Sequence, residues 1–196
     1  MQDNAAEELS ETHRRFLSTF PTREDGSQEE SLNDQLREYK LQLGKGQIQK
    51  AYKGIMTFMS GLRVYLEKQH PNFAVSALYF GYMDMTYFAF TPVDFKKLKL
   101  KIAIVYLHEQ SRFEVWLSGR DREIQAEYIA LFASKEIGSY RLSPILPGVD
   151  SILESILVDQ PDFDHPEGLS KRIETKTLEF VSDIRTLLNQ AMPSRE

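Results

Sequence analysis

Apolar and polar positions alternate along residues 73–117, a segment that is rich in aromatic and β-branched side chains. Such residues fit the pleated, half-buried surface of a β-sheet. The segment is too long for one straight strand, and turn residues near positions 81–84 and a connector at 92–97 divide it. It therefore predicts the sheet that organises the protein.

The second half of this segment predicts a hairpin of two strands, residues 98–108 and 112–118, around a short turn at Glu109 and Gln110. One face of the hairpin carries only large apolar side chains, so helices must cover it. A slip of one residue would exchange the two faces, which is why the apolar pattern fixes the register. The opposite face is mixed: it pairs Lys101 with Ser118, Ala103 with Trp116, Val105 with Glu114 and Leu107 with Arg112.

Apolar residues with a period of about 3.6 predict four helices, over residues 33–43, 47–68, 121–133 and 166–190. Residues 151–158 are ambiguous, and we favour a strand because the run is short and ends at a turn sequence. These elements together predict an α+β fold with one antiparallel sheet of about four or five strands and helices packed mainly on one face.

The second predicted helix contains two glycines, Gly54 and Gly61, which lie two turns apart. Glycine inside a helix costs about 1 kcal/mol relative to alanine. Two glycines near one face therefore predict the close approach of another backbone, which is a packing role and not a ligand cleft.

Acidic residues gather at the beginning of the chain. Residues 1–35 hold nine acids and three bases, a net charge of −6, so the rest carries +1 of the chain's total of −5. We predict an acidic, flexible leader over residues 1–31, a single α+β domain over 32–191 and a tail over 192–196. The domain lacks the basic excess that binding of a phosphate backbone requires, which disfavours nucleic acid as a partner.

Composition narrows the chemistry further. The 196 residues include no cysteine, so disulfides, thiolate nucleophiles and cysteine-ligated zinc are excluded. No apolar run approaches the roughly 18 residues of a membrane-spanning helix, and the acidic beginning is unlike a secretory signal. We expect a cytoplasmic protein with no membrane partner, no cofactor and no metal site, since the four histidines lack metal-ligand spacing.

No nucleophile elbow, phosphate loop or dinucleotide fingerprint is present. One catalytic alternative is a metal-dependent hydrolase or nuclease, in which Asp84 and Glu114 gather a cation. Trp116 occupies the position where such a site would have lysine, so Lys101 would have to replace it. The competing interpretation is that Lys101 and Glu114 are only a cross-strand surface pair.

Lysines cluster just before and within the first strand of the hairpin, at Lys96, Lys97, Lys99 and Lys101. With Trp116 nearby, they suggest a weak platform for single-stranded nucleic acid, which is a third hypothesis. Lysines beside a strongly apolar strand also serve to keep it from aggregating, and we favour that role.

The function we predict is a non-enzymatic binding or regulatory module that uses the mixed sheet face. Aromatic residues with a polar group are good anchors for a ligand or a protein partner. The sequence leaves open which partner binds and the oligomeric state. The candidate binding residues are Tyr82, Asp84, Lys101, Glu114 and Trp116.

Several short motifs of the chain resemble an uncharacterised bacterial domain family of unknown function. They are GYMDMTYF at residues 81–88, FEVWL at 113–117, KAY at 50–52 and VDQPDF at 158–163. The resemblance covers about residues 35–190 and implies a bacterial, cytoplasmic protein made of one domain. The family has no assigned activity, so the resemblance implies no substrate and no catalytic residue.

Overall fold

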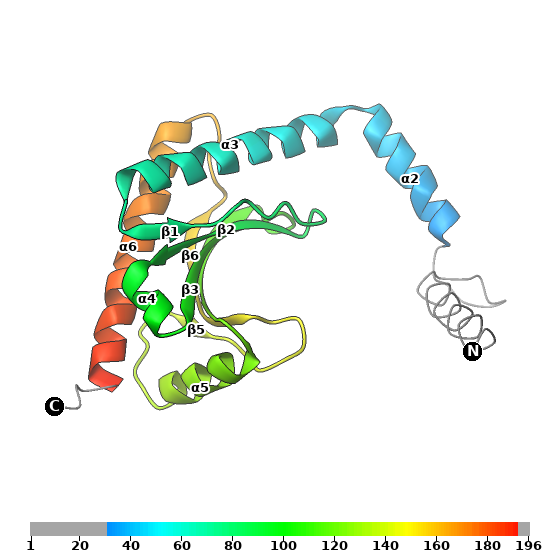
Figure 1. Ribbon diagram of the computed structural model, residues 1–196. Helices are drawn as coiled ribbons and strands as arrows, with labels where there is room; N and C mark the ends of the chain where they lie inside the picture. The colour runs from blue at the N-terminus through cyan, green and yellow to red at the C-terminus, as the bar shows by residue number, and fades with distance from the viewer. Residues whose placement is uncertain (1–30, 192–196) are drawn as a thin grey trace, which may run out of the picture. The chain divides into compact units, whose positions relative to one another are not determined.

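Six antiparallel strands form one sheet in the computed structural model, which describes residues 31–191 (Figure 1). The strand order is β1-β2-β3-β4-β6-β5, so β4 and β6 are neighbours although they are not consecutive. The sheet has more strands than the four or five that we predicted, because β5 falls in a segment without any apolar period. The strands are β1 (Phe73–Val75), β2 (Met85–Pro92), β3 (Leu100–Leu107), β4 (Arg112–Gly119), β5 (Arg141–Leu142) and β6 (Ser151–Asp159).

Five helices accompany the sheet in the described part of the chain, which establishes the predicted α+β class. The four predicted helices are present, and the fifth, α4, is a short helix in the connector between β2 and β3. Asp121 accepts a hydrogen bond from the backbone N–H of Ile124 at 3.0 Å and so caps α5. The helices are α2 (Leu32–Gly44), α3 (Gln47–Gln69), α4 (Val93–Lys97), α5 (Arg122–Ala133) and α6 (Pro166–Ala191).

The chain divides within α3 into two units, Met1–Gly54 and Ile55–Glu196. In the described part of the first unit, Ser31 and Asp34 form a capping box at the start of α2, and no residue of α2 is buried. The predicted leader, apart from Ser31, and the predicted tail lie outside the described residues. The single domain over residues 32–191 stays a prediction.

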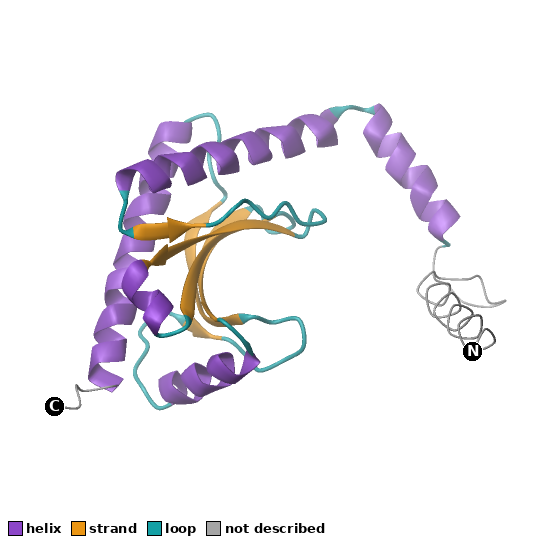
Figure 2. Cartoon of the chain, viewed as in Figure 1, coloured by secondary structure: helices purple, strands orange, loops and turns teal. Residues whose placement is uncertain are grey.

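The core of the second unit lies on the convex side of the curved sheet. There α6 and residues 55–69 of α3 cover the apolar face, while α5 lies at one end of the strands (Figure 2). Side chains with at most 2% exposure come from both layers. They include Met59, Leu62 and Leu66 of α3, Ile173, Phe180 and Ile184 of α6, and Ile102, Ile104, Val115 and Leu117 of the sheet.

The predicted hairpin register is confirmed. Ile102 pairs with Leu117, Ile104 with Val115 and Tyr106 with Phe113. The strand predicted over residues 151–158 is also confirmed, as β6. No helix in residues 31–191 combines the length and the apolar character needed to cross a membrane.

The predicted packing role of Gly54 and Gly61 is wrong. A Cβ atom built at either position would meet nothing within 4 Å among the described residues, and both glycines are exposed. The buried stripe of α3 runs through Met59, Leu62 and Leu66, so the two glycines face away from the core.

A buried carboxylate, Glu174 of α6, connects α6 to α3. Its oxygens lie 2.8 Å from the Tyr65 hydroxyl, 2.7 Å from His70 Nε2 and 2.8 Å from Lys171 Nζ. Burial raises the pKa of Glu174, but the hydrogen bonds from Lys171, His70 and Tyr65 outweigh it, so the pKa lies below its ordinary value of 4.5. Glu174 is therefore a charged link between two helices.

Candidate functional site

The mixed face predicted from the sequence is the concave side of the sheet. Side chains alternate along each strand, so the residues between the buried ones share this face. The register aligns Tyr87 of β2 with Val105 of β3 and Ala103 of β3 with Trp116 of β4. Within the described part of the second unit, residues 55–191, no helix lies across this face, which is opposite the core (Figure 2).

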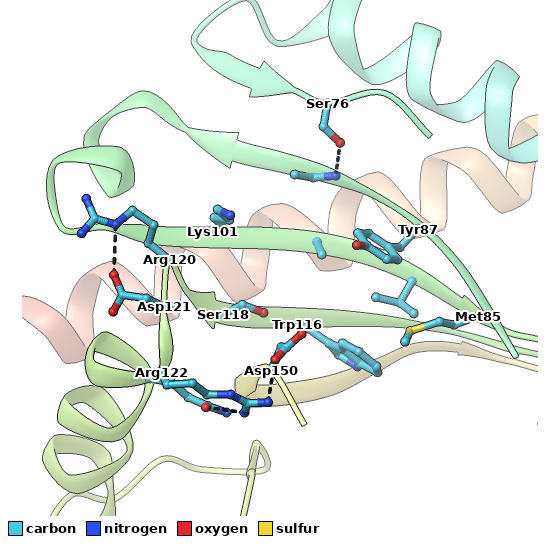
Figure 3. A pocket seen from close by; sticks show the side chains of 15 residues that line it. Ser76, Met85, Tyr87, Lys101, Trp116, Ser118, Arg120, Asp121, Arg122 and Asp150 are labelled. Atoms are coloured by element: carbon cyan, nitrogen blue, oxygen red, sulfur yellow. Dashed lines mark hydrogen bonds and ion pairs between the residues drawn. The ribbon is translucent and has the colours of Figure 1, made fainter. Parts of the chain in front are cut away.

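A cavity of about 520 Å³ occupies the concave face (Figure 3). We call it the sheet cavity. Its floor comes from β2, β3 and β4 and is mostly apolar, with Lys101 of β3 as the one charged residue among the described residues of the floor. Most of the polar lining residues come from the segment after β4, the start of α5 and the residue before β6. The floor includes Met85, Tyr87, Ala103, Val105 and Trp116, and the polar side includes Arg120, Asp121, Arg122, Gln125 and Asp150.

Trp116 is the only tryptophan of the chain. It is half-buried, and its indole N–H donates a hydrogen bond to Oε2 of Glu114 at 2.7 Å. Because its polar atom already has a partner, Trp116 presents an apolar aromatic surface to the sheet cavity.

Glu114 lies beneath this surface and is 1% exposed. Its Oε1 atom forms an ion pair with Arg112 Nε at 2.8 Å, and its Oε2 atom lies 3.8 Å from Arg141. Arg141 also pairs with Glu154 on the neighbouring strand. Two arginines therefore compensate the buried charge of Glu114. The Glu114 side chain positions Trp116 through the hydrogen bond to the indole and does not itself line the cavity.

The predicted surface pair of Lys101 and Glu114 does not form. Lys101 lies opposite Ser118, whereas Glu114 lies opposite Val105, four residues further along β3. Lys101 lines the sheet cavity and is exposed, and it forms no ion pair with any residue in 31–191. It is therefore a cation available to a ligand.

The two arginines beside the cavity already have partners. Arg120 pairs with Asp121 at 3.1 Å, and Arg122 pairs with Asp150 at 3.1 Å (Figure 3). Arg122 also donates hydrogen bonds to Gln125 Oε1 at 2.9 Å and to the carbonyl of Val149. The segment before β6 is thus attached to the start of α5, and this attachment builds one wall of the cavity.

Tyr87 stays protonated at neutral pH. Burial, and then the nearby Tyr79 and Asp150, raise the pKa of its phenol above the usual value of 10.0. The Tyr79 and Tyr87 rings lie 4.9 Å apart, which supports the Tyr87 ring in place. Tyr87 therefore contributes an aromatic surface and a hydroxyl that can donate a hydrogen bond.

Tyr82 and Asp84 do not line the cavity, although they lie in the turn just before Met85, which does. The Tyr82 side chain is 92% exposed. The Asp84 carboxylate accepts a hydrogen bond from the backbone N–H of Tyr82 at 2.9 Å, and backbone hydrogen bonds from Met85 and Tyr82 lower the pKa of Asp84. Its role here is to stabilise the turn.

The structure does not bring Asp84, Glu114 and Lys101 together. The Asp84 carbonyl accepts a hydrogen bond from the backbone N–H of His108, which lies seven residues from Lys101, or about 23 Å along an extended strand. Within residues 31–191, no group of three or more histidines and acids is placed to hold a metal ion. The convergence that the hydrolase alternative requires is missing.

The five residues on the polar side of the cavity were not predicted as site residues: Arg120, Asp121, Arg122, Gln125 and Asp150. They meet because the end of β4 lies beside the beginning of β6, where Ser118 pairs with Ser151. Nothing in the local sequence identifies the strand that β6 pairs with. The alternation of Arg120, Asp121 and Arg122 after a strand was the one available signal.

Comparisons with known proteins identify the family but no activity. A family model matches residues 32–188, and neither a curated protein nor a solved structure matches the chain. The match confirms the resemblance to an uncharacterised domain family. It covers most of the chain, which therefore belongs to the family described as a domain of unknown function, DUF7000.

Proposed function

We propose that this protein is a non-enzymatic binding module that holds a small ligand in the sheet cavity. The observation that carries the proposal is the form of the mixed face, a cavity of about 520 Å³ with Trp116 and Tyr87 on its floor and Lys101 at its side. Ligand sites are typically hollows of about 300–1,000 Å³ with apolar walls and a few polar groups. A flat apolar patch would instead have favoured a protein partner.

The lining supports binding over catalysis. A general acid or base must reach the substrate with a group that is free to exchange a proton. Asp121 caps α5 and pairs with Arg120, and Asp150 pairs with Arg122. No histidine occurs among the described lining residues. What the cavity offers is aromatic surface and positive charge.

These groups favour a ligand that has a flat ring and at least one negative charge. The ring would pack on Trp116 and Tyr87, and aromatic contacts of this kind contribute about 0.5–1.5 kcal/mol beyond the area they bury. The anionic group would bind Lys101, which has no carboxylate partner in the described part of the chain. The Tyr87 hydroxyl supplies a further donor.

The test uses 8-anilinonaphthalene-1-sulfonate, an aromatic anion that accepts energy from tryptophan. Because Trp116 is the only tryptophan, energy transfer from tryptophan reports that the dye binds near Trp116, and the Lys101 variant assigns it to the sheet cavity. We expect saturable transfer with one site per chain. The substitution Lys101→Gln is expected to weaken binding about tenfold, which corresponds to about 1.4 kcal/mol.

The matched control is Lys135→Gln, because Lys135 is exposed and lies outside the cavity lining. It should leave the affinity unchanged. Equal losses in the two variants, or binding of the dye without energy transfer, would contradict the proposal.

A further inference from the structure

A second hollow, of about 340 Å³, opens beside the sheet cavity. We call it the lysine hollow. Ser76, Ala89, Lys101 and Arg120 line both spaces, so the two are direct neighbours. Lys101 and Arg120 stand where they join, and a single ligand can occupy both.

The lining of the lysine hollow is strongly basic. It contains Lys96, Lys99, Lys101 and Arg120 and no acidic residue, although the chain as a whole carries −5. Asp121 is the carboxylate beside this group, and it is already committed to Arg120 and to capping α5. The positive charge is therefore left largely uncompensated.

The backbone holds these cations together. α4 ends in a tight turn in which the Lys99 N–H donates to the Lys96 carbonyl at 3.0 Å, and Lys99 has a φ of 58°. The Arg120 N–H donates to the Lys99 carbonyl at 2.8 Å, which fixes the end of β4 against this turn. A lysine in the left-handed region costs free energy, and such residues concentrate at functional sites.

We infer that the sheet cavity and the lysine hollow together bind one aromatic polyanion, such as a nucleoside di- or triphosphate. The aromatic half of this inference rests on the proposed function, whereas the polyanionic half rests on the lysine hollow. Trp116 pairs with Ala103, two residues along β3 from Lys101, or about 7 Å. A ring on Trp116 thus places its phosphates among Lys101, Arg120 and Lys99, and several phosphate oxygens can engage several cations at once.

The test measures how ATP, adenosine and inorganic pyrophosphate compete with 8-anilinonaphthalene-1-sulfonate on the full chain, with calorimetry as a direct measurement. ATP should bind more tightly than either of its parts. The double substitution Lys96→Gln and Lys99→Gln should weaken ATP about tenfold and leave adenosine and the dye unchanged. Lys97→Gln is the matched control, since Lys97 belongs to α4 but lines neither space.

The outcomes separate the two proposals. If energy transfer to the dye is seen but ATP binds no better than adenosine, the inference is overturned and the proposed function stands. The same conclusion follows if Lys97→Gln weakens the binding of ATP as much as the double substitution does. If no aromatic anion affects Trp116, the proposed function fails and the inference with it. If a single-stranded oligothymidylate displaces the dye at lower concentration than ATP, the ligand is a nucleic-acid strand and the inference is wrong.

Discussion

Gly119 ends β4 at a place where the chain turns back closely on itself. A Cβ atom there would lie 2.7 Å from the backbone nitrogen of Gln125 and 3.0 Å from the carbonyl oxygen of Asp121. Both atoms belong to the backbone at the start of α5, so they cannot yield as the end of a flexible side chain would. The missing side chain lets Asp121 and Gln125 reach the sheet cavity.

Alanine at Gly119 and alanine at Gly61 should therefore have opposite effects. Gly119→Ala forces a backbone overlap and should lower the free energy of unfolding by about 2 kcal/mol. Gly61→Ala adds a methyl group into open space in a helix and should raise it by about 1 kcal/mol. Urea denaturation of the two variants measures both changes. Changes of the same sign would show that one of the two environments is misassigned.

At the scale of single residues, the sequence predicts those cavity residues that lie on the hairpin of β3 and β4. Lys101 and Trp116 were assigned to the mixed face because the apolar alternation fixes the register of β3 on β4. Tyr82 and Asp84 were also predicted to belong to the site, Tyr82 as an aromatic residue with a polar group and Asp84 as an acid. Whether these residues line the cavity depends on how far it reaches along the sheet, and no local pattern encodes that distance.

At the scale of helices and strands, an element can be predicted from the sequence when its pattern of apolar and polar residues is long enough to recognise. β3 and β4 have eight residues each and a short connection, so their alternation and pairing can be inferred together. β5 has two residues and gives no period at all. The partner of β6 is separated from it by α5 and β5, and bulges near Glu114 and Ser118 shift the register. The wall that contains Asp150 depends on this long-range pairing.

The contact between α3 and α6 should depend on pH through Glu174. Because its pKa in the folded state lies below 4.5, its contribution to stability is complete above that value and is lost as the pH falls through the lowered pKa. Glu174→Gln should cost about 2 kcal/mol at pH 7, since it removes the charge from three hydrogen bonds. The difference from the parent protein should shrink as the pH is lowered through 4.5 and below.

Thermal or urea unfolding across this pH range provides the measurement. Glu136→Gln serves as the control, because Glu136 is exposed and lies outside this cluster. A constant difference between Glu174→Gln and the parent at every pH would mean that the charge of Glu174 does not contribute.

Across the whole described structure, β4 is a central strand, paired with β3 on one side and with β6 on the other. Amide hydrogens of β3, β4 and β6 should therefore exchange most slowly, while those of β1 and β5 exchange faster by at least about tenfold. Hydrogen exchange followed by mass spectrometry tests this order. Protection of β5 equal to that of β4 would contradict the strand order.

The two edges of the sheet, β1 with three residues and β5 with two, also affect how copies of this protein meet one another. An edge strand invites another chain to add a strand when it exposes a long row of unpaired backbone groups. Beyond β1, Ser76 and Tyr79 continue to donate backbone hydrogen bonds to β2, which shortens the free row there as well. At the β1 edge, addition of a strand from another copy should therefore be disfavoured, and any association between copies there should use side-chain surfaces.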